Sequence, residues 1–411
     1  MQTNLAPFIK DTPEGREAEA ILRKCVHCGF CTATCPTYQL LGDELDGPRG
    51  RIYLIKEVLE GSPATARTQL HLDRCLTCRS CETTCPSGVE YGRLVDIGRA
   101  VVDAQVPRSA GERVTRYALS AGLRSKTLFG AALGLGRMTK GLLPRGLGRR
   151  VPAGRPAGEW PGPRHERRML ILEGCVQPAL APSIDAAMAR VLDRIGISAE
   201  SVPGGGCCGA LPFHLNDQEG ARELARRNID AWWPLVAAGA EAIVVTASGC
   251  GVMVKDYGHL MAGDAAYAKK AVRVAELAKD PVEIVGDEWK RIAPMVAMDL
   301  GSQRVAFHPP CTLQHGQKLR GRVEELLRAL GHELVPVADS HLCCGSAGTY
   351  SILQPELANQ LRRQKLLALQ AEHPEVIATA NIGCQTHLAS GTSRPVRHRI
   401  ELVDEKLIDG A

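Results

Sequence analysis

Two runs of cysteines decide the fold of the first hundred residues: CVHCGFCTATCP at 25–36 and CLTCRSCETTCP at 75–86. In each run the cysteines follow one another at intervals of three, three and four residues, and a proline follows the last. Three thiolates at intervals of three can each bind one iron of the same cluster, and the proline then turns the chain away. The spacing therefore predicts iron–sulfur centres.

This spacing is the bacterial ferredoxin signature, present twice. In the known ligation of that signature, the fourth cysteine of each run binds the other cluster. We therefore expect one [4Fe-4S] cluster on Cys25, Cys28, Cys31 and Cys85, and a second on Cys75, Cys78, Cys81 and Cys35. A pair of structural zinc sites is the alternative, because C-x-x-C is also a zinc motif, but zinc does not account for the third cysteine or the proline.

Helical patterns accompany the two runs. Ile52, Ile55 and Leu59 share one face of a helix predicted over 51–60, and a second helix is predicted over 94–102. We expect these helices to cover the clusters and keep water out, which tunes the reduction potential. The segment 42–50 between the runs is rich in turn residues and is expected to be structural.

Length and composition describe a globular chain of several domains. The 411 residues suggest about three domains, and the 45% hydrophobic and 23% charged residues exclude a collagen-like, coiled-coil or disordered chain. Residues 1–24 lack the apolar run of a signal peptide, and no stretch approaches the apolar length of a membrane-spanning helix. We expect a cytoplasmic protein whose sixteen cysteines are metal ligands or redox groups rather than disulfides.

The other eight cysteines form an internal repeat. Cys175, Cys207 and Cys208 return as Cys311, Cys343 and Cys344 at an offset of 136, and Cys250 returns as Cys384 at an offset of 134. Strand-like runs precede the cysteines in both copies, and helical stretches such as 184–195 and 322–330 lie between the strands. This pattern predicts two α/β units with a cysteine-lined pocket at the carboxyl ends of the strands. Buried thiols acting as small hydrophobes explain one pair, but not two matched quartets.

A basic segment separates the two halves. Residues 108–168 hold fourteen Lys or Arg against three Glu, which gives this segment a charge of +11 in a chain of net charge +5. Leu128, Leu135, Met138 and Leu142 recur at helical spacing, but the glycines among them weaken a helix and Pro144 ends it. The segment is either a solvated connector or a docking surface for an acidic partner subunit or an anionic membrane face. Nucleic acid is not expected as a partner, because no binding motif accompanies the charge.

The repeats resemble the cysteine-rich (CCG) domains of heterodisulfide reductase subunits. Together with the two ferredoxin runs, the chain resembles the iron–sulfur subunits of bacterial glycolate oxidases over nearly its whole length. The specific stretches are GDELDGPRGRIYLIKEVLEG at 42–61, SGCGVMVKDYGHL at 248–260 and NIGCQTHL at 381–388. In that family, flavin subunits oxidise a 2-hydroxy acid and the iron–sulfur subunit takes up the electrons. The resemblance, and not the spacing, implies glycolate.

The repeats depart from the family pattern at one position. The pattern ends in C-x-x-C, whereas Met253 and His387 stand at the final positions here. Met253 is expected in the core, while His387 either replaces a thiolate or satisfies a backbone carbonyl. The eight cysteines Cys175, Cys207, Cys208, Cys250, Cys311, Cys343, Cys344 and Cys384, with His387, are therefore candidate metal or redox residues that hold an iron–sulfur cluster or zinc, or stay free thiols.

Missing motifs exclude other functions for this chain. It has no G-x-G-x-x-G after a strand and no Walker sequence, so we expect no flavin or nicotinamide site and no catalytic residue on it. Iron–sulfur clusters move single electrons, so a flavin (FAD) on partner subunits is expected to convert two-electron oxidation into single transfers. The histidines near cysteines, His27, His71, His214, His308, His315 and His341, are expected to be supporting or surface groups.

These observations predict an α/β protein with a helical dicluster ferredoxin-like domain at 1–105, a basic helical linker at 106–166, and cysteine-rich repeats at 167–295 and 296–411. The predicted role is electron transfer from flavoprotein subunits of a glycolate oxidase or dehydrogenase to a quinone or another acceptor. Peripheral contact with the inner face of the inner membrane is a further expectation. A self-contained reductase of disulfides and a non-catalytic iron–sulfur adaptor are the alternatives.

Overall fold

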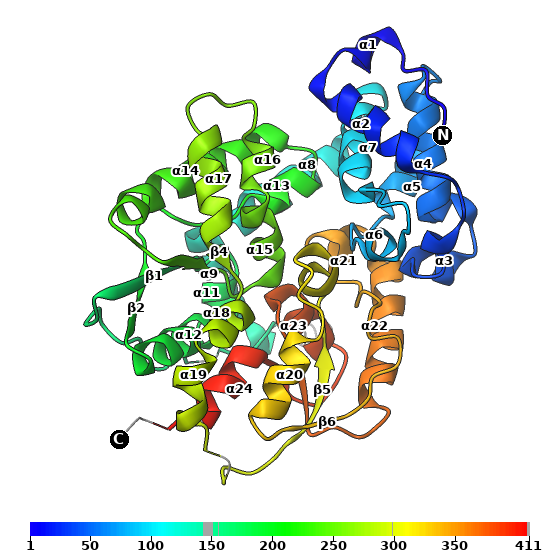
Figure 1. Cartoon of the computed structure of the whole chain (residues 1–411). Coiled ribbons are helices and arrows are strands. Elements are labelled where there is room, and N and C mark those ends of the chain that lie inside the picture. Colours follow the sequence, from blue (N-terminus) through cyan, green and yellow to red (C-terminus); the bar gives the residue numbers. More distant parts are fainter. Residues whose placement is uncertain (143–150, 155, 298, 409–411) are drawn as a thin grey trace.

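The computed structural model describes residues 1–142, 151–154, 156–297 and 299–408. A helical N-terminal module is followed by two helices that lead into a first α/β unit, and a second α/β unit completes the chain (Figure 1). The predicted architecture of a helical dicluster module and two α/β repeats is confirmed.

The N-terminal module consists of short helices around one apolar core. Its helices are α1 (Pro7–Lys10), α2 (Pro13–Lys24), α3 (Pro36–Leu41), α4 (Pro48–Leu59), α5 (Ala66–Asp73), α6 (Ser80–Thr84) and α7 (Tyr91–Gln105). Proline stands at the start of α2, α3 and α4, where its missing N–H costs nothing. Gly50 is required in α4, because a Cβ there would lie 2.1 Å from the carbonyl oxygen of Glu44.

Two helices connect the module to the first repeat. They are α8 (Ala110–Arg124) and α9 (Lys126–Met138), and a short 3-10 turn at Lys140–Leu142 follows. Although three glycines lie within it, α9 is continuous, and Ser125 caps its start by accepting the Leu128 N–H. The tertiary setting thus outweighs the low helix propensity of glycine, since α9 packs on α11 of the first repeat.

The first repeat alternates strands and helices. Its elements are β1 (Arg167–Ile171), α11 (Gln177–Leu180), α12 (Ser183–Arg194), β2 (Ile197–Ser201), α13 (Ala210–His214), α14 (Gln218–Ala237), β3 (Ala242–Val244), α15 (Ser248–Lys255), α16 (Tyr257–Leu260), α17 (Ala268–Leu277), β4 (Ala278–Lys279), α18 (Pro281–Asp287) and α19 (Trp289–Ile292).

The second repeat follows the same plan with fewer helices. Its elements are β5 (Arg304–His308), a π-helical turn at Thr312–Gly316, α20 (Arg322–Ala329), β6 (Glu333–Leu334), α21 (Tyr350–Leu353), α22 (Pro355–Gln370), β7 (Val376–Thr379), α23 (Ile382–Ala389), β8 (Val396–His398) and α24 (Arg399–Lys406).

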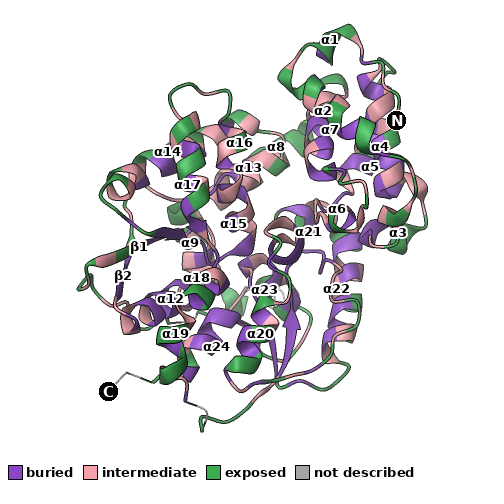
Figure 2. Cartoon of the chain, viewed as in Figure 1, coloured by how far each residue is buried: buried purple, intermediate pink, exposed green. Residues whose placement is uncertain are grey.

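Both repeats have the same four-stranded parallel sheet. The strand orders are β2-β1-β3-β4 and β6-β5-β7-β8, so the sequence repeat is also a topological one. Strands and inward helix faces are buried in both units (Figure 2). One apolar cluster contains residues of both repeats, and the buried ion pair between Arg399 and Asp280 also joins them. The two repeats therefore form a single packed body.

Candidate iron–sulfur centres and cysteine-rich sites

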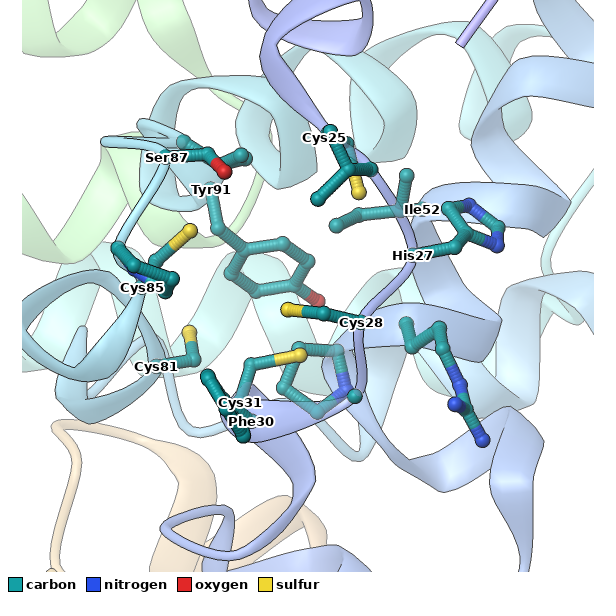
Figure 3. Close-up of a pocket in the computed structure, with 16 residues that line it drawn as sticks. Cys25, His27, Cys28, Phe30, Cys31, Ile52, Cys81, Cys85, Ser87 and Tyr91 are labelled. Atoms are coloured by element: carbon teal, nitrogen blue, oxygen red, sulfur yellow. The ribbon is translucent and has the colours of Figure 1, made fainter.

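The first cysteine run surrounds a pocket in the N-terminal module. Cys25, Cys28 and Cys31 line it, and Cys85 from the second run lies across from them (Figure 3). About 430 Å³ of the pocket, including space open to solvent, is free of protein atoms, and Cys81 also lines it. The chain thus brings together four cysteines that the sequence separates by up to sixty residues.

The second run surrounds a neighbouring pocket of about 300 Å³. Cys75, Cys78 and Cys81 line it together with Cys35 from the first run. Tyr91 lines both pockets, and its hydroxyl donates to Cys75 Sγ at 3.7 Å. The fourth cysteine of each run thus lies with the other run's first three.

The backbone follows the same path in both runs. His27 and Gly29 have positive φ angles, and so do Thr77 and Arg79 fifty residues later. These turns curl the chain around each pocket. In the second run, the Thr77 N–H donates to Cys75 Sγ at 3.4 Å. The repeated strain at non-glycine positions indicates that the surrounding structure holds these loops in a preformed shape.

Burial opposes free thiolates in both pockets. It raises the pKa of Cys31 to about 11, with the neighbouring Cys25 adding to the effect, and it raises the pKa of Cys78 and Cys81 well above the usual range. Buried thiolates need a compensating positive charge, which bound iron supplies. The donor set and the enclosed space therefore fit iron–sulfur clusters.

Buried arginines lie beside the second pocket. Arg51 is 1% exposed, lines this pocket, and donates through Nη1 to Thr37 Oγ1 at 3.1 Å. Its charge is balanced by Asp46, whose Oδ1 lies 3.3 Å from Arg51 Nη2. Arg99 donates to the Cys75 carbonyl oxygen at 2.6 Å. Neither Asp46 nor Arg51 is among the residues predicted from the sequence for this site: Asp46 lies in the turn-rich stretch 42–50, which was expected to be structural, and Arg51 begins the helix predicted over 51–60.

The cysteines of the first repeat form a continuous row. Side-chain hydrogen bonds join Cys175 to Cys207, Cys207 to Cys208, and Cys208 to Cys250. The hydrogen bond with Cys207 and burial raise the pKa of Cys175. Met253 is buried in the apolar core of this repeat, as expected.

The cysteines of the second repeat form a similar row. Cys311 Sγ lies 3.9 Å from Cys343 Sγ, and further side-chain hydrogen bonds join Cys343 to Cys344 and Cys344 to Cys384. His387 Nε2 lies 3.2 Å from the Ala358 carbonyl oxygen. Of the two roles expected for His387, the contact with a backbone carbonyl is the one observed.

The second repeat lies directly against the second pocket. Cys343 belongs to an apolar cluster that includes Leu76 and Tyr350, and Cys78 and Cys311 pack on it. Tyr350 donates through its hydroxyl to the Arg74 carbonyl oxygen at 3.1 Å. Residues more than 260 positions apart in the sequence thus form one continuous region of cysteines.

Most described basic side chains between 108 and 168 pair within the chain. Arg108 contacts Asp73 and Asp103, and Lys126 and Arg167 also form ion pairs. Four of the fourteen basic residues between 108 and 168 lie outside the described residues: Arg145, Arg149, Arg150 and Arg155. The exposed side chains of α8 and α9 are instead often apolar: Val114, Tyr117, Leu128, Leu135 and Met138. None of the helices in the described ranges combines the length and hydropathy that a membrane span needs.

Models of two known protein families match this chain. The 4Fe-4S dicluster domain matches residues 21–89, and the cysteine-rich domain matches residues 169–255 and 305–389. The chain is 55% identical over 409 residues to the glycolate oxidase iron-sulfur subunit of Escherichia coli (strain K12), covering 99% of both chains.

Two more distant relatives extend the comparison. The chain is 30% identical over 413 residues to the probable glycolate oxidase iron-sulfur subunit of Bacillus subtilis (strain 168), covering 92% of this chain and 91% of the relative. It is 25% identical over 248 residues to lactate utilization protein A of Geobacillus thermodenitrificans, covering 56% of this chain and 96% of the relative.

Proposed function

Because the chain belongs to the family of glycolate oxidase iron–sulfur subunits, we propose that it transfers electrons in the oxidation of glycolate or a related 2-hydroxy acid. The observation that carries this proposal is the pair of adjacent pockets, each lined by four expected ligands and sharing Tyr91. Two redox centres in these neighbouring pockets, separated only by shared lining residues, are suited to rapid single-electron transfer.

The proposed ligands follow the two pockets. Cys25, Cys28, Cys31 and Cys85 hold one [4Fe-4S] cluster, and Cys75, Cys78, Cys81 and Cys35 hold the other. When bound, the clusters accept and release single electrons. The chain's own residues enclose them and keep water out, and the buried ion pair of Arg51 with Asp46 beside the second pocket contributes to the potential there.

The proposed complex includes flavoprotein subunits. Oxidation of a CH–OH group removes two electrons, so a partner's FAD is needed to divide them between one-electron carriers. The electrons then continue to a quinone or another acceptor. This chain is not catalytic alone in this scheme. We assign the docking of the flavoprotein to the exposed apolar side chains of α8 and α9, and peripheral membrane contact is the alternative use of the same surface.

Reconstitution tests the proposal. The anaerobically purified chain is expected to contain about eight irons, and its absorbance should bleach with glycolate only after the flavoprotein partner is added. Glycolate-dependent bleaching by the chain alone would contradict the proposal, and so would its absence in the assembled complex. Reduction of disulfides by the chain alone would favour the alternative of a self-contained reductase.

Single serine variants test the ligand sets. Cys35→Ser is expected to remove the EPR signal of the cluster in the second pocket, although Cys35 belongs to the first run. Cys85→Ser is the matched control and should remove the other signal. If each variant lost the cluster of its own run, the crossed ligand sets would be wrong.

A further inference from the structure

The two cysteine runs share one backbone path but differ in what covers them. At the offset of 50 that relates the runs, Val26 corresponds to Leu76, and Phe30 corresponds to Ser80. Leu76 and Ser80 are buried, with exposed fractions of 6% and 1%. Val26 and Phe30 are instead 68% and 62% exposed. The outer side of the first loop, residues 26–30, is therefore bare where that of the second loop is covered.

The second repeat covers the second loop. Leu76 and Cys78 pack in one apolar cluster with Cys343 of that repeat. Further along the run, Thr83 Oγ1 lies 2.8 Å from His315 Nδ1. A protein surface that carries cysteines thus lies directly against the outer side of the second pocket. The first loop has the same backbone path, but its outer side chains face solvent.

The bare loop is apolar and carries an expected ligand of the first cluster. Cys28 is exposed, and it lines the first pocket together with Val26 and Phe30; Figure 3 shows Cys28 and Phe30 on this loop. Tyr53 is also exposed, and its ring packs edge-on against that of His27 at a centroid distance of 6.4 Å. Large apolar side chains that are exposed around one point mark an interaction surface.

The charges beside the loop favour a protein partner. Lys24 Nζ lies 2.9 Å from Glu90 Oε2, and Arg49 Nε lies 2.6 Å from Glu44 Oε1. An anionic membrane face attracts basic side chains that surround an apolar surface, whereas these two cations are already paired within the chain. Apolar side chains among balanced charges are typical of the surfaces at which proteins bind one another.

The position of the loop favours a partner that delivers electrons. From the second pocket, cysteines continue into the molecule, because Cys78 packs on the same cluster as Cys311 and Cys343. The first pocket lies at the other end of this series, where Cys28 is exposed. Because electron transfer slows steeply with distance, a donor has to bring its cofactor close to an exposed end of the series. The first pocket provides that end.

We propose that loop 26–30 is the surface at which the flavoprotein delivers electrons, with Val26 and Phe30 buried against it in the complex. This inference rests on the proposed function, and it adds the electron-transfer contact to the docking surface assigned to α8 and α9. Single electrons pass from the partner's reduced flavin to the cluster in the first pocket, and the protons of the flavin are released on the partner's side. The second pocket and the second repeat then lie on the path to the acceptor.

A double variant of the loop tests this contact. Val26→Ser with Phe30→Ser removes apolar surface and keeps every cysteine, so iron content and the EPR signals after reduction with dithionite should equal those of wild type. Reduction of the clusters by glycolate and the flavoprotein, followed by stopped-flow absorbance, should be at least about tenfold slower. Val26→Leu, which copies Leu76, should keep the wild-type rate. Val272→Ser with Leu367→Ser is the matched control, because both side chains are exposed and line neither pocket.

Hydrogen exchange of the wild-type chain tests the loop without a variant, and decides the question if the double variant loses iron. Amides of residues 26–30 should exchange more slowly once the flavoprotein is bound, whereas those of residues 76–80, which the second repeat already covers, should not change.

Three outcomes would overturn the proposal. They are a wild-type rate in Val26→Ser with Phe30→Ser, unchanged exchange at 26–30 in a complex that forms, and slower exchange with anionic vesicles but not with the flavoprotein. The last outcome would assign the loop to the membrane. Failure of the proposed function is distinguishable from all three, because the clusters of the wild-type chain would then stay oxidised in the presence of glycolate and the flavoprotein.

Discussion

The two cysteine-rich repeats have the same parallel strand order and four matched cysteines, yet their buried neighbours differ. The first strand of one is followed by Leu172, whereas that of the other ends in His308. The first repeat supports α9, and the second lies against the second ferredoxin pocket through Cys343 and Leu76. The two repeats thus keep the same topology while the side chains around their cysteines differ. Strand order depends on the packing of the whole sheet, whereas the chemistry around the cysteines depends on a few side chains.

The largest expected effect is a difference in the rate of electron transfer between variants of the second repeat and matched variants of the first. In the assembled enzyme, Cys343→Ser should slow transfer from the flavin to an artificial acceptor at least about tenfold, because Cys343 packs with Leu76 and Cys78, which line the second pocket. Cys207→Ser, the matched variant, should slow it by less than about threefold. Steady-state rates measure both. Equal losses of rate in the two variants would show that proximity to the second pocket does not determine the contribution of a repeat to electron transfer.

The next prediction concerns Asp185, a buried carboxyl group of the first repeat. Burial raises the pKa of Asp185 to about 7, although Thr246 and Gln177 donate hydrogen bonds to it. The folded state therefore favours the protonated acid, so the free energy of unfolding should fall by up to about 4 kcal/mol as the pH rises from 4 to 7. Asp185→Asn should remove this loss and raise the urea midpoint at pH 8.

A control on the same helix accompanies this measurement. Hydrogen bonds from Arg164 and His165 lower the pKa of Asp193 against the effect of its burial, so Asp193→Asn should not increase stability at pH 8. If the urea midpoints of wild type and Asp185→Asn depended on pH in the same way between 5.5 and 8, ionisation of Asp185 would not be the cause of the loss of stability.

A buried histidine of the second repeat should make the stability depend on pH in the opposite direction. Burial, with a contribution from Arg399, lowers the pKa of His398 to about 3, and His398 Nε2 lies 3.1 Å from the Thr246 carbonyl oxygen. The folded state favours the neutral ring, so stability is present above pH 6.5 and should fall by about 2 kcal/mol as the pH falls to 5.

Variants isolate this histidine. His398→Gln keeps a hydrogen-bond donor and should make the urea midpoint less dependent on pH between 5 and 7. The exposed His373, changed to Gln, provides the control. An unchanged slope in His398→Gln would assign the acid sensitivity to another group.

The smallest effect on stability is expected at the surface. Leu135 and Met138 are exposed on α9, so Leu135→Ser with Met138→Ser should change the free energy of unfolding by less than about 0.5 kcal/mol. The same change should weaken binding of the flavoprotein, as measured by analytical ultracentrifugation. Leu367→Ser, on an exposed face of α22 in the second repeat, is the control. Unchanged binding of the partner, with reduced binding to anionic vesicles, would assign the surface to the membrane.

Local sequence was sufficient for much of the architecture. The intervals between cysteines identified the two runs, and the offset of 136 identified the repeat, because both depend on short-range spacing. The helix predicted over 51–60 is observed as α4, and that predicted over 94–102 lies within α7. The glycines between 126 and 138 predicted a weak helix, yet α9 is continuous, because its contacts with the first repeat compensate for their low helix propensity. The domain boundaries and the ligand sets remain predictions.

The sequence by itself determined which side chains are present as metal donors: sixteen cysteines in matched runs and quartets. Only the tertiary structure decided which donors meet. It brings Cys78 and Cys343 into one apolar cluster, buries Arg51 beside Asp46, and leaves His308 without a partner beside Cys344. The physical reason is that spacing along the chain fixes contacts only within a turn or loop, whereas burial and the pairing of polar atoms depend on segments that fold together from distant positions.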